Sequence, residues 1–254
     1  MQSVIYPEFK NKHILITGGA SGIGKATTIN FLKQGSIVSV IDFNKKALSN
    51  LKLDLSNNNN IQIYHADVSN LSKMNDVVNT AENLSGPVNV LVNNAGSNVR
   101  VEFEKINLEI WNKHLTHNLN HFFYISQLIL PNMKKLDGGS IINISSSAWM
   151  KLAPKLAAYH ASKAGIIGLT CGMARDLGKY FIRVNAVAPG RVFTENEKIV
   201  QRNNNYNWEK ETFKIQCIPK LIQPENIADT ILWLASDQSA LVTGQTIVID
   251  GGVV

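Results

Sequence analysis

Residues 13–24 read His-Ile-Leu-Ile-Thr-Gly-Gly-Ala-Ser-Gly-Ile-Gly, an apolar run that leads directly into a turn rich in glycine. A helical pattern follows, with apolar residues at Ala26, Ile29 and Phe31-Leu32, and it ends at Gly35. A turn of this kind lets the backbone approach a diphosphate and directs the free N–H groups of a helix toward it. The glycine spacing, GxxxGxG, differs from the GxGxxG of the dinucleotide fingerprint, so a purely structural turn is the alternative interpretation.

The rest of the chain alternates β-branched apolar runs with helical patterns. The further runs that predict strands are residues 37–41, 61–64, 88–92, 140–144, 182–187 and 246–249. Apolar strands joined by helical crossovers are typical of a parallel sheet with helices on both faces. No linker divides the chain. We therefore expect a single α/β domain over residues 1–254, with a Rossmann-type, doubly wound parallel sheet of about seven strands.

Composition excludes several classes of protein. The 254 residues are 44% hydrophobic and 17% charged, which favours a packed core that needs no metal or disulfide and excludes disorder. No membrane-length apolar run is present, and the first ten residues lack the pattern of a signal peptide. The net charge of +6 comes from scattered lysines, whereas a nucleic-acid site would gather them. We expect a cytoplasmic protein with no membrane or nucleic-acid partner.

Metal binding is also not expected. Cys171 and Cys217 lack the spacing of a zinc site and are predicted to be buried apolar thiols. We interpret the histidines near the middle of the chain as structural or surface groups. They are His114, His117, His121 and His160.

An acidic residue ends the second predicted strand. Asp42 lies 18 residues beyond Gly24, a position from which a carboxylate can bind the two hydroxyls of a ribose. The alternative is a helix N-cap, because Asn44 and the residues after it have a helical pattern.

A tyrosine and a lysine follow the fifth predicted strand. Tyr159 and Lys163 are four residues apart, so on a helix they share one face. A nearby lysine favours the phenolate and lowers the pKa of the tyrosine from about 10, which would make Tyr159 a general acid and base. The alternative is a surface tyrosine beside a solvated lysine.

Together these features resemble the classical short-chain dehydrogenases/reductases over nearly the whole chain. Ser146 precedes Tyr159 by 13 residues, the separation usual in that family, which selects it over Ser145 and Ser147. The matching motifs stand in the family's order. They are Thr17 to Gly24, Asp67-Val68, Asn93-Asn94-Ala95-Gly96, Asn118, Ser146, Tyr159 with Lys163, Pro189-Gly190, Thr243-Gly244-Gln245 and Asp250-Gly251-Gly252.

The resemblance implies hydride transfer between a nicotinamide dinucleotide and an alcohol or ketone carbon. It implies that Tyr159 is the acid and base, and that Ser146 orients the substrate oxygen. Lys163 would bind the nicotinamide ribose and depress the pKa of Tyr159, and Asn118 would anchor a water in a proton relay. The implied cofactor residues are Gly18, Ser21, Gly22, Ile23, Gly24, Asp42, Asp67, Val68, Asn94, Gly96, Tyr159, Lys163, Pro189, Gly190, Val192 and Thr194.

The main prediction is an NAD(H)-dependent oxidoreductase acting on a small secondary alcohol or ketone, with Asp42 selecting NAD. One alternative is an NADPH-dependent 3-oxoacyl-carrier-protein reductase, although those relatives usually have a basic residue where this chain has Ser21. A second is a non-catalytic dinucleotide sensor, which would be free to lose one of the four catalytic residues. The family also implies a homotetramer, and the apolar segment 122–130 supports that weakly.

Several residues around the expected pocket lie outside the motifs of the family. Trp149 is predicted to wall a narrow pocket, and His121 stands where relatives often have a small residue. Arg100, Lys151 and Arg191 would suit an anionic substrate, but a solvated surface position is the preferred interpretation for each. Residues 191–222 are expected to form a mobile lid, because an Asn-rich middle is combined with four aromatic side chains. These are Phe193, Tyr206, Trp208 and Phe213.

Overall fold

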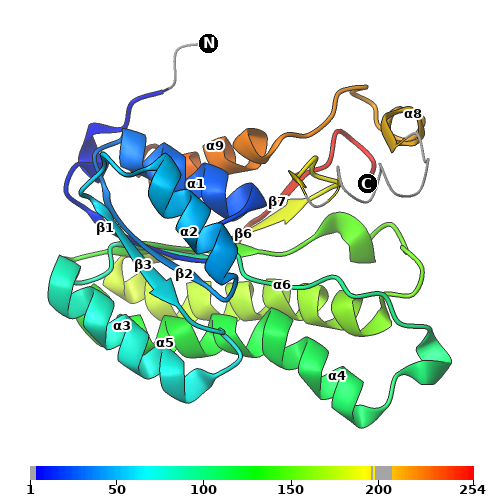
Figure 1. The fold of residues 1–254 in the computed structure, drawn as a ribbon, viewed down its shortest axis with the longest axis horizontal. Coiled ribbons are helices and arrows are strands. Elements are labelled where there is room, and N and C mark those ends of the chain that lie inside the picture. The colour runs from blue at the N-terminus through cyan, green and yellow to red at the C-terminus, as the bar shows by residue number, and fades with distance from the viewer. Residues whose placement is uncertain (1–3, 196, 198–207) are drawn as a thin grey trace.

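Seven parallel strands form one twisted sheet in the computed structural model, which describes residues 4–195, 197 and 208–254 (Figure 1). The strand order is β3-β2-β1-β4-β5-β6-β7. The strands are β1 (His13–Thr17), β2 (Ile37–Asp42), β3 (Ile61–His65), β4 (Val90–Asn93), β5 (Gly139–Ile144), β6 (Ile182–Pro189) and β7 (Thr246–Ile249). Every predicted strand is present, with ends that differ by at most two residues, and the predicted fold class is confirmed.

Helices cover both faces of the sheet. On one face lie α1 (Gly22–Lys33), α2 (Lys45–Asp54) and α9 (Pro224–Ala235). On the other lie α3 (Leu71–Ser85), α4 (Leu108–Leu115), α5 (His121–Met133) and α6 (Ala157–Leu177). A short helix, α8 (Trp208–Phe213), lies in the connection between β6 and α9.

The period-two pattern of the strands separates two apolar cores. In β1, Ile14 and Ile16 pack into the core under α1, α2 and α9, while Leu15 packs into the core under α3, α5 and α6. Successive strand side chains point to opposite faces, so a strand that is buried on both faces must be apolar throughout. The burial of Phe31 and Ile129, one in each core, follows from this arrangement.

The direction of winding reverses between β1 and β4. The chain passes outward from β1 to β2 and β3, then crosses back to form β4 on the other side of β1. Thr17 and Asn93 are partners in the ladder at the carboxyl ends of these two strands. Ligands of open α/β sheets bind outside the carboxyl ends at such a reversal, so Gly18 and Asn94 stand at the expected binding crevice.

The two cysteines and the predicted lid differ in how far the structure describes them. Both cysteines are exposed, which contradicts the predicted buried thiols. Thr170 lies on the buried stripe of α6, and Cys171, the next residue, points away from it. The Cys217 sulfur contacts the carbonyl of Gly252 at 3.0 Å. Within the predicted lid, residues 196 and 198–207, including Tyr206, lie outside the described residues, so its mobility stays a prediction.

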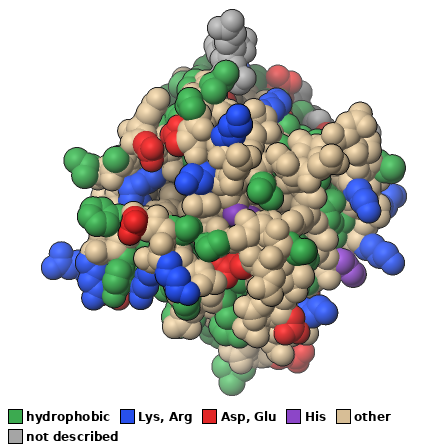
Figure 2. All heavy atoms as spheres, turned by 90° about the vertical axis from the view of Figure 1, so that its left-hand side faces the viewer, with side chains coloured by type: hydrophobic (Ala, Val, Ile, Leu, Met, Phe, Trp, Pro, Cys, Tyr) green, Lys and Arg blue, Asp and Glu red, His purple; other side chains and the backbone are tan. Residues whose placement is uncertain are grey.

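The described part of the chain has no helix that is both long enough and apolar enough to cross a membrane. On the face shown in Figure 2, lysine and arginine side chains lie in several separate places among acidic, apolar and uncharged groups.

Candidate active site

The glycine turn after β1 is shaped by contacts that exclude side chains. Gly18 and Gly22 have positive φ angles of 64° and 49°. A Cβ at Gly24 would lie 2.0 Å from the carbonyl oxygen of Gly18, so only glycine fits there. Helix α1 begins at Gly22, its N-cap Ser21 makes no side-chain capping bond, and its first turn has no acidic residue. The N–H groups at this helix start are therefore available to a diphosphate.

Asn94 fixes the shape of this turn from the neighbouring strand. Its side-chain amide donates hydrogen bonds to the carbonyls of Thr17 and Gly18 at 3.1 and 2.9 Å. The backbone N–H groups of Asn94 and Ala95 donate in return to the Thr17 hydroxyl. The ends of β1 and β4 are thereby joined by side chains beyond the last rungs of the ladder. Asn94 thus holds the glycine turn, and with it the crevice, in this shape.

Asp42 is a buried carboxylate attached to the glycine turn. One carboxylate oxygen accepts the N–H of Ala20 at 3.1 Å, and the other accepts the N–H of Asn44 at 2.9 Å. The N-cap of α2 is Asn44, whose side chain accepts from Ala47, so the alternative role predicted for Asp42 is wrong. Each carboxylate oxygen has a further lone pair, which suits it to accept a hydroxyl proton.

Asp67 and Val68 follow β3, next to the end of β2. Asp67 is half-exposed and accepts the N–H of Ser69 at 2.8 Å, while Val68 is buried. Partial burial alone would raise the pKa of Asp67, but the hydrogen bonds from Ser69, together with His117 and His121, outweigh it and hold the pKa below its ordinary value. Because Asp42 and His65 are ladder partners, these residues extend the crevice toward the open edge of the sheet.

Four candidate catalytic residues come from three elements. Tyr159 and Lys163 lie one turn apart on α6, and Ser146 is the second residue after β5. Asn118 is fully buried in a π-helical stretch between α4 and α5, residues Thr116–Asn120. Such π-helical turns often occur at functional sites because they redirect side chains within a helix.

Two of these residues, Asn118 and Lys163, meet beside Gly96. A Cβ at Gly96 would lie 2.9 Å from Asn118 Oδ1 and 3.4 Å from Lys163 Nζ. The Lys163 ammonium donates to the carbonyl of Ile144 at 2.8 Å, and the Ser145 hydroxyl donates to the Lys163 carbonyl at 2.7 Å. Ser145, which the sequence did not assign a role, therefore fixes α6 against the end of β5.

Burial changes the ionisation of both α6 residues. Burial raises the pKa of Tyr159, and a hydrogen bond with Ser146 opposes this only in part. Burial also lowers the pKa of Lys163 to about 7. The Lys163 Nζ lies 5.8 Å from the centre of the Tyr159 ring. The sequence predicted a lowered pKa for Tyr159, and the structure gives the opposite direction because the interior desolvates the phenolate and the ammonium alike.

We predict a pH-dependent stability difference between the wild type and Lys163→Met. A buried lysine with a pKa near 7 holds fewer protons than its unfolded counterpart, whose pKa is about 10.4. Folding is therefore penalised below about pH 7, and the penalty disappears as the pH rises toward 10. In the ligand-free protein, the Tm of the wild type should rise relative to that of Lys163→Met between about pH 6 and 9.5. Lys155→Met, at an exposed lysine, should give a flat difference, and a flat difference for Lys163→Met would contradict the prediction.

The segment after β6 returns to the glycine turn. Pro189 ends β6, and the N–H of Gly190 donates to the carbonyl of Ile249 at 2.8 Å. Val192 is buried and pairs with Ile222. The Thr194 methyl would lie 3.1 Å from a Cβ at Gly22. The structure therefore places these residues on the same crevice as the turn, and Ile23 packs against the core beneath it.

Several polar and aromatic side chains near the crevice have partners within the protein. Arg100 donates to the Pro154 carbonyl at 2.6 Å, and Arg191 lies 3.4 Å from Glu197. His121 is fully buried against Phe122, and burial lowers its pKa to about 3. Trp149 is partly buried, and its indole N–H has no partner. The described residues contain no group of three or more His, Cys, Asp or Glu side chains placed to bind a metal.

Lys151 does not occupy the solvated surface position preferred from the sequence. Its ammonium lies 3.4 Å from the carboxylate of Asp250, a residue only 3% exposed. The Gln216 amide donates to the Asp250 carbonyl at 3.1 Å. The sequence reasoning missed this group, because its members come from segments far apart in the chain. The only signal was the Asp250-Gly251-Gly252 motif.

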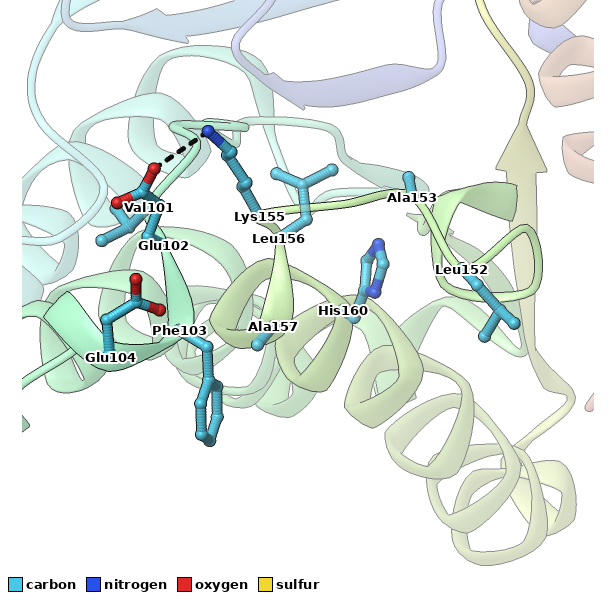
Figure 3. A pocket seen from close by; sticks show the side chains of 10 residues that line it. All are labelled: Val101, Glu102, Phe103, Glu104, Leu152, Ala153, Lys155, Leu156, Ala157 and His160. Atoms are coloured by element: carbon cyan, nitrogen blue, oxygen red, sulfur yellow. Dashed lines mark hydrogen bonds and ion pairs between the residues drawn. The ribbon is translucent and has the colours of Figure 1, made fainter.

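A cavity of about 560 Å³ opens beside the start of α6 (Figure 3). His160 lines it together with Leu152, Lys155 and the segment 101–104, and Lys155 forms an ion pair with Glu102 at its rim. Tyr159 and Ser146 do not line it. This cavity therefore lies next to the candidate active site and is separate from it.

Comparisons with known proteins agree with this geometry. A family model described as enoyl-(acyl carrier protein) reductase matches residues 18–254. D-xylose 1-dehydrogenase of Caulobacter vibrioides is 37% identical over 253 residues, which cover 99% of each chain. The chain belongs to the classical short-chain dehydrogenases/reductases. As a member of this family it is an oxidoreductase that acts on alcohol and ketone groups with a nicotinamide dinucleotide.

Other members of the family match this chain over a similar share of its length. A 3-oxoacyl-[acyl-carrier-protein] reductase of Thermotoga maritima is 39% identical over 249 residues, covering 96% of this chain and 98% of the relative. A crystal structure described as a glucose/ribitol dehydrogenase from Brucella melitensis superposes with a TM-score of 0.89 at 27% identity, covering 99% of each chain. The similarity thus spans the whole fold and includes enzymes with different substrates.

Proposed function

We propose that this short-chain dehydrogenase/reductase is an NAD(H)-dependent aldose dehydrogenase that oxidises the C1 hydroxyl of a cyclic sugar to a lactone. One observation carries the choice of substrate. Among the described residues, ten buried side-chain polar atoms have no hydrogen-bond partner, and five of them belong to segments beyond the carboxyl ends of β5, β6 and β7. They are Ser147 Oγ, Trp149 Nε1, Thr212 Oγ1, Gln216 Oε1 and Asp250 Oδ2, of which the last has no hydrogen bond but forms the ion pair with Lys151.

Buried polar groups are normally satisfied, and an unsatisfied group costs about 1–3 kcal/mol. A set of such groups in the segments that follow these strand ends favours a ligand with many hydroxyls, since each hydroxyl both donates and accepts. The hydrocarbon part of an acyl chain would satisfy none of them, and a steroid, which carries few hydroxyls, would satisfy only some. The names of the Caulobacter and Brucella relatives support the same substrate class.

The candidate catalytic residues suit this reaction. The Ser146 hydroxyl oxygen accepts the N–H of Ala148 at 3.1 Å, so the Ser146 proton, which bonds Tyr159 here, would turn to the substrate oxygen when a substrate binds. Tyr159, after losing its own phenolic proton toward Lys163, would take the proton of the C1 hydroxyl as the C1–O bond becomes a carbonyl. The bound nicotinamide would supply the acceptor for the hydride that leaves C1. Lys163 and a water held at Asn118 would pass the proton from Tyr159 to solvent.

Three features support NAD as the coenzyme. Asp42 is a buried carboxylate held at the glycine turn, where it would accept the 2′-hydroxyl of the adenosine ribose. The residue after it is the exposed Phe43, which offers no charge to a 2′-phosphate. The glycine turn itself contains the uncharged Ser21.

The 39% identity of the Thermotoga enzyme favours a second candidate, 3-oxoacyl-carrier-protein reduction. Asp42 and Ser21 count against it, because both disfavour the NADPH that those relatives usually use. The complete set of catalytic residues counts against a non-catalytic sensor.

A substrate panel tests the proposal. Purified protein would be assayed by NADH absorbance with D-xylose, D-galactose, D-glucose, ribitol, hydroxysteroids and hydroxy acids, and with 3-oxoacyl thioesters in the reverse direction. We expect the highest kcat/KM for an aldose with NAD. Activity confined to thioesters with NADPH would establish the second candidate instead.

We further propose a cytoplasmic homotetramer. On α5, Phe123 is 48% exposed within the apolar segment 122–130, so part of that face remains available to another copy. Light scattering at micromolar concentration should give four times the 28.0 kDa chain mass, and a monomer would contradict the proposal.

A further inference from the structure

Lys151 crosses the end of the sheet to reach its partner. It lies in the segment that leaves β5, whereas Asp250 directly follows β7. Strand β6 stands between those two strands, so the ion pair spans the point where Pro189 and Gly190 leave the sheet. A Cβ at Gly190 would lie 2.6 Å from the Cβ of Asp250. The pair therefore stands beside the segment assigned to the nicotinamide, on the side of Ser146 and Tyr159.

Asp250 is fixed in place by its other bonds. One carboxylate oxygen accepts the N–H groups of Gly252 and Val253, both at 3.0 Å. These bonds and the charge of Lys151 outweigh burial and hold the pKa of Asp250 below its ordinary value. The other oxygen faces only the ammonium, at a distance of 3.4 Å. Asp250 is thus a rigid, ionised support for Lys151.

Lys151 is the accessible half of the pair. Its side chain is 20% exposed, compared with 3% for Asp250. An ammonium group has three N–H donors, and one carboxylate oxygen at this distance leaves the others available. The side-chain amide of Gln216 donates to the backbone carbonyl of Asp250, and the side-chain oxygen of the same residue, Oε1, has no donor. A hydroxyl group could accept from Lys151 and donate to such an oxygen.

We propose that Lys151 is a specificity-determining residue that donates a hydrogen bond to a sugar hydroxyl away from C1, and that Asp250 positions it. This inference rests on the proposed aldose dehydrogenase function. Because the two opposite charges compensate one another, the pair selects a neutral hydroxyl over a carboxylate. The anionic substrate considered from the sequence for Lys151 is therefore disfavoured.

The first test replaces the ammonium. With the best aldose of the panel, Lys151→Met should raise KM at least about tenfold, as expected for loss of a hydrogen bond to a charged donor. Its kcat should change less than about threefold, and the Kd for NAD should be unchanged, because neither the reacting carbon nor the dinucleotide contacts Lys151. Lys155→Met, which breaks an exposed ion pair on the same segment, is the matched control and should behave like the wild type.

The second test removes the compensating charge. Asp250→Asn keeps the shape and an acceptor for Gly252, but leaves the ammonium without its carboxylate. We expect KM for the neutral aldose to rise and KM for the corresponding uronic acid, with the same C1 hydroxyl and a C6 carboxylate, to fall. Their ratio should shift by at least about tenfold. Thermal melts would establish that both variants are folded.

The outcomes separate the two claims. An aldose-active wild type whose KM is unchanged within about twofold by Lys151→Met would overturn the role of Lys151 and leave the proposed function standing. Equal effects of Lys151→Met and Lys155→Met, or an unchanged aldose-to-uronate ratio in Asp250→Asn, would also overturn it. A wild type that oxidises no aldose would overturn the proposed function, and the sugar contact with it.

Discussion

Tyr159→Phe should lower kcat by about 10²–10⁴-fold and leave the Kd for NAD within about threefold of the wild type. The ring of the phenylalanine fills the same space on α6, so the fold and the dinucleotide crevice remain. The lost hydroxyl is the group that would exchange a proton with the substrate oxygen beside Ser146. Lys163 does not take the place of this hydroxyl, because its Nζ donates to the carbonyl of Ile144 and lies 5.8 Å from the centre of the Tyr159 ring.

Single-turnover rates and NAD titrations of the ligand-free protein would measure the two quantities separately. Tyr180→Phe is a suitable control, because Tyr180 is partly buried beside Lys134 and Lys179, outside the candidate site. A Tyr159→Phe enzyme that retained a tenth of the wild-type kcat would show that the proton is exchanged elsewhere.

The sheet was predictable because its information is local. Each strand that is buried on both faces needs a continuous apolar run, and each of the runs from 13–16 to 246–249 forms a strand. The glycine turn was predictable for a similar reason. Gly18 has a positive φ angle, and a Cβ at Gly24 would collide with the carbonyl of Gly18, so both positions require glycine.

Other parts of the site depend on contacts between distant segments. Nothing in the sequence near Lys151 indicates that its ammonium meets Asp250, 99 residues later, at the end of another strand. The raised pKa of Tyr159 depends on the extent of burial, which a lysine at i+4 does not reveal. The exposure of Cys171 depends on which stripe of α6 faces the sheet, and a helix as apolar as this one leaves that stripe poorly defined.

The wild type should prefer NAD to NADP by about 10²-fold in kcat/KM, a difference of about 2.7 kcal/mol. The 2′-phosphate of NADP carries a charge of about −1.5 to −2, and within about 4 Å of a carboxylate it would be repelled by several kcal/mol at an effective dielectric constant near 20. The exposed Lys45 and Lys46 offset part of that repulsion, so we expect a preference and not complete exclusion.

Asp42→Ala should lose efficiency with NAD and gain it with NADP. Its interpretation is complicated by the backbone N–H groups of Ala20 and Asn44, which lose their acceptor and weaken the glycine turn for both coenzymes. Asp42→Asn keeps a side-chain oxygen for one of these donors while removing the charge. The ratio of the two kcat/KM values cancels a general weakening, so both variants should shift that ratio toward NADP.

A matched control is Asp54→Asn. It removes an exposed carboxylate on α2 that is paired with Lys25 of α1. Asp54 is 53% exposed, so solvent screens its charge, and the coenzyme ratio of this variant should equal that of the wild type. If Asp42→Asn and Asp54→Asn shifted the ratio equally, the selection would come from net charge and not from the ribose contact. A wild type that preferred NADP would contradict the assignment of Asp42 and would favour the 3-oxoacyl-carrier-protein reductase alternative, since the buried carboxylate would then have to tolerate a phosphate beside it.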